Sequence, residues 1–104
     1  MTTPDIRLRL ELTEAAHADL RAIYLYGLET WGEAQADSYQ TRLEQALSLL
    51  AAQPRLGRSK DTFFSGCRLL TVAQHEIAYV IRDDRIDVLR VLPWRIPLEC
   101  QRLS

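Results

Sequence analysis

Two amphipathic helical patterns separated by a single glycine restrict the fold more than any other feature of the chain. Apolar residues recur at steps of three and four over residues 16–31 and again over residues 36–50, which is the spacing of one buried face of an α-helix. Gly32 lies between the two patterns, and glycine tolerates the left-handed backbone that often ends a helix. A connection this short turns the second helix back along the first, so the sequence predicts an αα-hairpin.

The ends of both helices carry recognisable signals. Thr13 is the expected N-cap of the first helix, because its hydroxyl accepts an orphan backbone N–H, and Glu14 lies favourably in the first turn. Glu33 opens the second helix and Pro54 stops it. Small residues in the second helix allow the two helix axes to approach closely: Ala36, Ala46 and Ala51.

Residues 6–12 alternate between apolar and charged side chains, which predicts a half-buried strand. A strand without a neighbour would leave its backbone groups unpaired. We therefore expect this strand to join a sheet formed by the C-terminal half of the chain. The helical hairpin then covers one face of that sheet and leaves the other face open.

The C-terminal half contains three short runs of strand-forming residues: 67–72, 76–82 and 85–92. The connections between them are too short for crossovers, so these strands are antiparallel. Asp83 and Asp84 form the tight turn before the last strand, and Pro93 ends the sheet. Residues 54–66, which are rich in glycine, proline and serine, are expected to be a loop. The resulting fold class is α+β, in the order β-α-α-β-β-β, with a four-stranded sheet and a short C-terminal tail.

Simple alternation in the last strand does not select its buried face. It places two sets of side chains on opposite faces: Ile86, Val88, Arg90 and Leu92 against Asp87, Leu89 and Val91. Each set mixes aliphatic and charged residues. The sequence therefore leaves open which set packs under the helices.

Length and composition indicate one globular domain, residues 1–104. Hydrophobic residues make up 47% of the chain and charged residues 26%, as in ordinary soluble domains. No apolar run approaches the ~20 residues that cross a bilayer, and the N-terminus lacks a secretory pattern, so we expect a cytoplasmic protein. Cys67 and Cys100 are far apart and have no histidine at metal-binding spacing. We therefore expect no metal and no cofactor.

Charge is divided unevenly along the chain, although the net charge is only −1. Residues 1–53 hold four basic and eight acidic side chains, whereas residues 54–104 hold nine basic and six acidic ones. This division predicts an acidic helical half and a basic sheet half, a field that would orient a partner. The weak overall charge argues against sequence-blind binding of nucleic acid.

Seven short motifs follow one another in a fixed order: Leu20-x-x-Ile23-Tyr24, Trp31-Gly32-Glu33-x-Gln35-Ala36-x-x-Tyr39, Leu43-x-x-Ala46, Pro54-x-x-Gly57-Arg58, Gly66-Cys67-Arg68, His75-x-Ile77-x-Tyr79 and Ile86-x-Val88-Leu89-Arg90-Val91-Leu92. In this order, over residues 8–94, the chain resembles the ParE branch of the ParE/RelE superfamily of type II toxin–antitoxin toxins. The resemblance implies a plasmid-stabilisation type of toxin that binds and inhibits DNA gyrase without chemistry of its own. It also implies neutralisation by a ParD-like antitoxin in a hetero-oligomer that contacts DNA only through the antitoxin.

The segment after the last strand departs from this family pattern. Many relatives have a histidine there, whereas this chain has Pro93 followed by Trp94, neither of which transfers a proton. An RNA-cleaving toxin of the sister RelE branch is the alternative, and it needs cations and proton-transfer groups. The residues available for those roles are Arg68, Arg90, His75, Glu76 and Tyr79. A non-toxic member that only binds antitoxin is the third hypothesis.

Six residues are candidates for contact with an antitoxin or a target: Arg58, Arg68, His75, Arg90, Trp94 and Arg95. Arginine and tryptophan are enriched at protein interfaces. Each candidate also has a structural alternative: Arg90 paired with a nearby acid, Arg58 bonded to carbonyls of its own loop, Trp94 packed under the helices. Our hypothesis is that the basic sheet half, through Arg68 and Arg90, receives acidic residues of an antitoxin tail.

Overall fold

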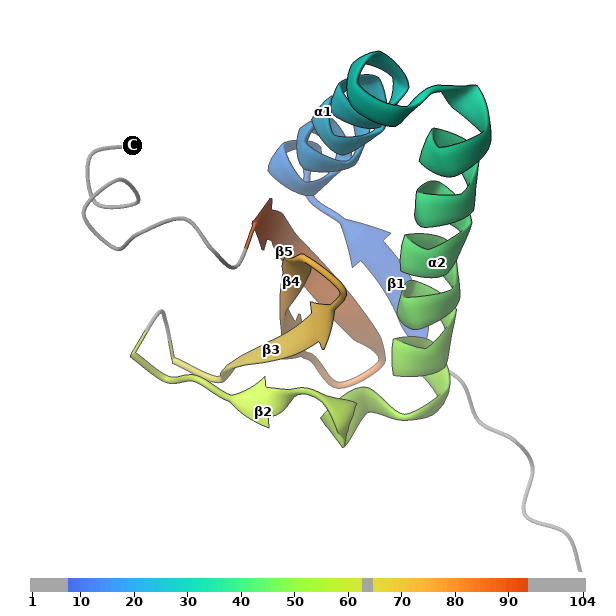
Figure 1. Cartoon of the computed structure of the whole chain (residues 1–104). Coiled ribbons are helices and arrows are strands. Elements are labelled where there is room, and N and C mark those ends of the chain that lie inside the picture. Colours follow the sequence, from blue (N-terminus) through green and yellow to red (C-terminus); the bar gives the residue numbers. More distant parts are fainter. Residues whose placement is uncertain (1–7, 63–64, 94–104) are drawn as a thin grey trace, which may run out of the picture.

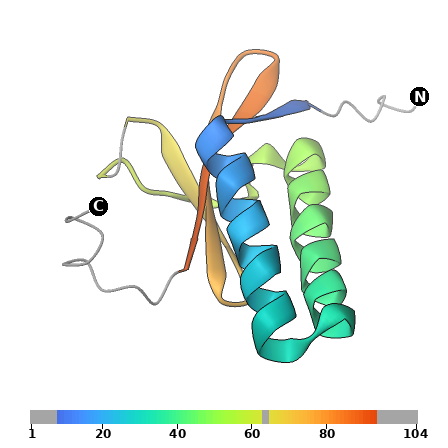
Figure 2. The same cartoon turned by 90° about the horizontal axis from the view of Figure 1, so that it is seen from above.

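A helical hairpin lies across one face of a five-stranded sheet (Figures 1 and 2). The computed structural model describes residues 8–62 and 65–93. In chain order the elements are β1 (Arg9–Leu12), α1 (Glu14–Trp31), α2 (Glu33–Ala52), the 3₁₀ turn η1 (Pro54–Leu56), β2 (Arg58–Ser59), β3 (Cys67–Val72), β4 (His75–Ile81) and β5 (Arg85–Pro93). The strands are arranged in the order β1-β5-β4-β3-β2. The predicted α+β fold is confirmed.

The predicted ends of the helical hairpin are also confirmed. The Thr13 hydroxyl accepts a hydrogen bond from the Ala16 N–H at 3.0 Å. Gly32, with φ of 97°, separates α1 from α2 and is the only residue between them. Its backbone conformation is one that side chains with a Cβ rarely adopt.

Close contact between the helices depends on small residues near the hairpin tip. A Cβ placed on Gly27 of α1 would lie 3.3 Å from the Cβ of Ala36, which is 2% exposed. Beside this contact, the Tyr24 hydroxyl donates a hydrogen bond of 2.6 Å to Asp37. The alanine predicted to allow close approach at position 36 therefore does so opposite a glycine.

The N-terminal strand joins the sheet in an orientation that differs from its neighbours. β1 pairs in parallel with β5, from Arg9 opposite Arg85 to Leu12 opposite Val88, whereas the other strand pairs are antiparallel. Both helices and the other three strands separate β1 from β5 in the chain, and so long a connection permits a parallel pair. The sheet is therefore mixed. Residues 6 and 7 of the predicted strand lie outside the described residues.

The segment predicted as a loop contains η1 and an additional edge strand, β2. The buried hydroxyl of Tyr79 holds this segment, since it accepts from the Gly57 N–H at 2.8 Å and donates to the Pro54 carbonyl at 2.6 Å. A Cβ on Gly57 would lie 2.6 Å from that hydroxyl oxygen. Glycine is required here by close approach, and the contact brings β2 alongside β3.

The last strand, β5, contains a β-bulge that shifts which of its side chains share a face. Val88 lies opposite Tyr79, but Arg90 lies opposite the adjacent Ala78, so Leu89 is an extra residue on β5. As a result Val88 and Val91, three residues apart, both face the helices. The prediction from strict alternation was wrong at this point, because a bulge shifts which side chains share a face.

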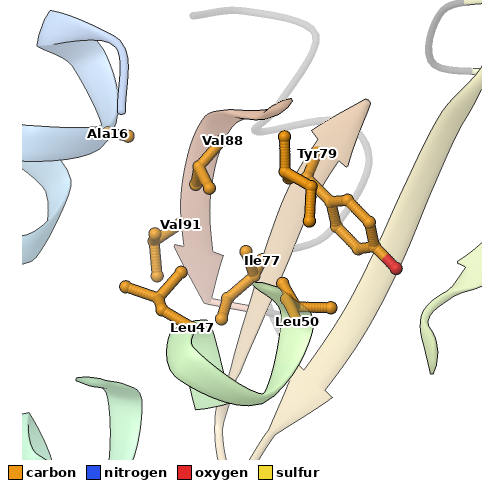
Figure 3. Packing of buried hydrophobic residues seen from close by; sticks show 8 residues of the cluster. Ala16, Leu47, Leu50, Ile77, Tyr79, Val88 and Val91 are labelled. Atoms are coloured by element: carbon orange, nitrogen blue, oxygen red, sulfur yellow. The ribbon is translucent and has the colours of Figure 1, made fainter. Parts of the chain in front are cut away.

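The main core lies between this strand, β4 and the helices (Figure 3). Its buried members come from both helices and from two strands: Ala16, Leu47, Leu50, Ile77, Tyr79, Ile86, Val88 and Val91. A second, smaller cluster is formed by Cys67, Leu69 and Ala78, each at most 4% exposed. Ala78 alternates with Ile77 and Tyr79 along β4, so this cluster lies on the opposite face of the sheet. That face is therefore only partly open.

Candidate protein-binding surface

Arg90 connects β5 to α1. Its guanidinium donates two hydrogen bonds to the Asp19 carboxylate, from Nε at 2.8 Å and from Nη2 at 2.9 Å. The same carboxylate accepts the Val91 backbone N–H at 2.9 Å. The hydrogen bonds to Asp19 raise the pKa of Arg90. Arg90 is therefore paired with an acid, which was the structural alternative for this residue. Even so, 48% of its side chain remains exposed.

Arg68 holds the η1–β2 segment. Its Nη1 donates to the Gly57 carbonyl at 2.6 Å and, more weakly, to the Arg55 carbonyl at 3.4 Å. Together with the Tyr79 hydroxyl, this guanidinium fixes the chain just before β2. Arg68 thus makes the loop contacts that the sequence suggested for Arg58.

Arg58 instead bonds side chains of the neighbouring strands. Its Nη2 lies 2.7 Å from a carboxylate oxygen of Glu76, and its Nη1 donates to the Thr71 hydroxyl at 3.2 Å. Thr71 in turn donates to Glu76 at 3.2 Å. This small network crosses β2, β3 and β4, and 54% of the Arg58 side chain is exposed.

His75 is hydrogen-bonded rather than fully solvated. Its Nδ1 lies 2.7 Å from the Tyr39 hydroxyl, which also contacts the Val72 carbonyl at 3.3 Å and accepts the Gln74 N–H at 3.2 Å. Burial lowers the pKa of His75, and the Asp19 carboxylate partly opposes that effect. The histidine and Tyr39 therefore join α2 to the turn between β3 and β4.

The described candidates form two groups. Arg58 and Arg68 lie at the β2–β3 edge, whereas His75 and Arg90 lie near Asp19. Two further candidates, Trp94 and Arg95, lie outside the described residues. The candidate residues therefore lie in two separate places and do not form one cationic site. In each place, some of the arginine N–H donors already bond to groups within the protein.

The structure adds a surface that the sequence analysis did not predict. A hollow of about 300 Å³ lies at the hairpin tip and is lined by Trp31, Gln35, Ser38, Tyr39, Arg42, Ala73 and Gln74. Trp31 is 47% exposed. The sequence contains one signal for this hollow, because polar residues follow Trp31 at steps of three or four: Gln35, Ser38 and Arg42. The hollow also needs the β3–β4 turn, which is distant in sequence.

Three side chains that could act as nucleophiles or transfer protons are buried or already paired within the protein. Tyr79 is fully buried, Glu76 is paired with Arg58, and burial raises the pKa of the Cys67 thiol. Within residues 8–62 and 65–93, no cluster of three or more metal-ligating side chains is present. None of the helices in that part of the chain has the length and apolarity to span a membrane. What these described surfaces offer is exposed arginine and apolar area, which suit protein recognition.

Two solved structures from toxin–antitoxin systems contain a chain with this fold. The chromosomal ParDE system from P. aeruginosa contains a chain that matches with a TM-score of 0.73 at 22% identity, covering 84% of this chain and 96% of that chain. The RelBE2 complex from Mycobacterium tuberculosis contains one with a TM-score of 0.62 at 19% identity, covering 85% and 99%. The architecture is therefore the small α+β fold that these two structures contain.

Sequence comparison identifies the family within this class. The family model for the ParE toxin of the type II toxin–antitoxin system parDE matches residues 10–95. Toxin ParE1 of Mycobacterium tuberculosis is 37% identical over 92 residues, 88% of this chain and 94% of the relative. Toxin ParE1 of Caulobacter vibrioides is 30% identical over 81 residues, 78% and 83% of the two chains. The chain belongs to the ParE family of toxins of type II toxin–antitoxin systems.

Proposed function

We propose that this ParE-family toxin binds and inhibits DNA gyrase in the cytoplasm and is neutralised by a ParD-like antitoxin. The observation that carries the proposal is family membership over residues 10–95. The relatives share nearly the full length of the chain with it, so the proposal concerns the whole domain.

The proposed mode of action is binding, without a chemical step performed by the toxin. Cleavage of RNA needs a proton-transfer group near cations. His75 is bonded to Tyr39, and the Tyr79 hydroxyl is buried between Gly57 and Pro54. Neither arrangement offers a free general base beside Arg68 or Arg90, which supports inhibition by binding.

The proposed antitoxin contact uses donors that intramolecular partners leave available. An antitoxin tail that is disordered alone folds across the toxin as it binds. Arg58 and Arg90 keep about half of their side-chain surface exposed while bonded to their acids, and guanidinium carries five N–H donors. Acidic residues of the tail would take the remaining donors, and DNA would be contacted only through the antitoxin in the hetero-oligomer.

The decisive experiment is a supercoiling and cleavage assay with purified gyrase, with and without the antitoxin. The proposal predicts loss of supercoiling and accumulation of cleaved DNA, both reversed by antitoxin. Induction of the toxin alone should cause filamentation and DNA-damage signalling. Unchanged gyrase activity together with cut mRNA would instead support an RNase toxin, and normal growth would support a non-toxic antitoxin-binding member.

The arginine contribution needs a control because both Arg68 and Arg90 also have structural roles. The double variant Arg68→Ala, Arg90→Ala should weaken antitoxin binding and toxicity. Asp19→Asn is the matched control for Arg90, since it weakens the link between α1 and β5 but keeps the arginine. If the double variant binds antitoxin and kills cells as the unmodified toxin does, the arginine hypothesis is wrong. An equal loss in the control variant would assign the effect to structure.

A further inference from the structure

The hollow at the hairpin tip is formed by parts of the chain that are distant in sequence. Trp31 ends α1, while Gln35, Ser38 and Arg42 lie along one side of α2. Gln74 belongs to the turn between β3 and β4. Figure 2 shows the hairpin tip and this turn at the same end of the molecule.

The walls of the hollow are held in place before any partner arrives. The Tyr39 hydroxyl contacts the Val72 carbonyl, the Gln74 N–H and His75 Nδ1, so α2 and the β3–β4 turn are connected at three points. Ala73 in that turn has φ of 54°, a left-handed conformation in which the turn geometry outweighs local strain. A pre-organised hollow binds with a smaller entropic cost than one that must form on binding.

The electrostatic character of the hollow is set by Arg42. At about 100° per residue along an α-helix, Arg42 lies on the side of α2 opposite to its acidic residues: Glu33, Asp37 and Glu44. Within residues 8–62 and 65–93, no hydrogen bond or ion pair engages the Arg42 guanidinium. Three further polar residues of the lining, Gln35, Ser38 and Gln74, are neutral and can donate hydrogen bonds. The hollow therefore favours an anionic group.

The apolar side of the hollow is Trp31. Trp31 is 47% exposed, and its ring meets the Tyr26 ring edge-on, with centroids 5.8 Å apart and planes at 89°. Tryptophan and arginine are the residues most enriched among interface positions that carry most of the binding energy. Here an exposed tryptophan lines the same hollow as an arginine that has no partner among the described residues.

We propose that this hollow binds an acidic, apolar segment of a partner protein. A carboxylate of the segment bonds to Arg42, with Gln35 and Ser38 as supporting donors, and a neighbouring apolar side chain packs on Trp31. An acidic segment is favoured over a neutral or basic one because its charge is opposite to that of Arg42. This inference does not depend on gyrase being the target, because it assigns only the chemistry of the bound segment.

The test uses Trp31 as a fluorescent reporter. The chain has two tryptophans, so Trp94→Phe leaves Trp31 as the single one. Two eight-residue peptides are titrated at low salt, one alternating aspartate with leucine and one alternating lysine with leucine. The acidic peptide should change Trp31 emission in a saturable manner, and the lysine peptide should bind at least tenfold more weakly.

Variants then locate the contact. Arg42→Gln should weaken binding of the acidic peptide at least tenfold without changing the circular dichroism spectrum, since no described contact depends on this side chain. Arg21→Gln, which removes an exposed arginine of α1, is the matched control and should bind as the parent does. Equal binding by the Arg42 variant, equal binding of the lysine peptide, or no saturable binding would overturn the proposal. Displacement of the acidic peptide by oligo-dT from the parent but not from the Arg42 variant would also overturn it, in favour of a nucleic-acid partner.

Discussion

Removal of the Asp19 carboxylate should destabilise this toxin more than removal of the arginine that it binds. Asp19 accepts three hydrogen bonds, two from Arg90 and one from the Val91 backbone. Its side chain is 15% exposed, and Val91 is 1% exposed. Asp19→Ala therefore leaves a buried N–H donor on β5 without its partner, whereas Arg90→Ala leaves that bond intact.

The magnitudes follow from the environment of each bond. A hydrogen bond to a charged group contributes about 1.5–3 kcal/mol, and the Val91 contact belongs to this class. The Arg90 ion pair is half exposed, so solvent screening limits it to at most about 1 kcal/mol. We expect Asp19→Ala to lower the free energy of unfolding by about 2–4 kcal/mol. Arg90→Ala should cost about 1 kcal/mol or less, and the double variant about as much as Asp19→Ala alone.

Urea denaturation followed by far-ultraviolet circular dichroism measures these differences directly. The comparison is made at constant protein concentration and ionic strength, with equal slopes required before the free energies are compared. The reasoning is refuted if Arg90→Ala costs as much as Asp19→Ala, or if Asp19→Ala costs less than about 1 kcal/mol.

Three further predictions concern the β-sheet and its turns. Tyr79→Phe should lower the free energy of unfolding by about 1–3 kcal/mol, measured by urea denaturation, because the buried Gly57 N–H loses its acceptor; an unchanged midpoint would contradict this. Burial lowers the pKa of His75 below 6.5, so its contribution to stability is complete above about pH 6.5 and is lost as pH falls toward the folded-state pKa. His75→Gln should flatten that part of the stability–pH curve, and parallel curves would refute the assignment. Ala73→Gly should raise the thermal midpoint slightly, by up to about 1 kcal/mol in stability, because φ is positive; a lower midpoint would count against strain at this turn.

The elements that sequence predicted well are those specified by local signals. Both helices have a periodic apolar face and a recognisable end residue, and Thr13 and Gly32 act as predicted. The three C-terminal strands lie within one residue of their predicted bounds. Short-range periodicity and capping chemistry determine these features, so no knowledge of distant partners was needed.

The features that sequence missed depend on residues far apart in the chain. The direction of β1 is set by its pairing with β5, and β2 forms because Tyr79 and Arg68 fix the segment around Gly57. The bulge at Leu89 is bonded to the N-cap residue of α1, since Thr13 Oγ1 donates to the Leu89 carbonyl at 2.7 Å. No short-range pattern contains these contacts.

The uneven charge along the chain shows why the candidate site was only partly predictable. Counting charges by sequence half assigns Arg90 to a basic face, yet the acid that binds it, Asp19, belongs to the acidic half. Other arginines are also engaged by acids, as Arg82 and Arg85 are by Asp87. Within residues 8–62 and 65–93, the cationic side chains that have no hydrogen-bond or ion-pair partner of any kind lie on both halves: Arg21, Arg42, Arg55 and Lys60. Recognition of an acidic partner depends on which cations lack an internal acid, and only the folded arrangement determines that.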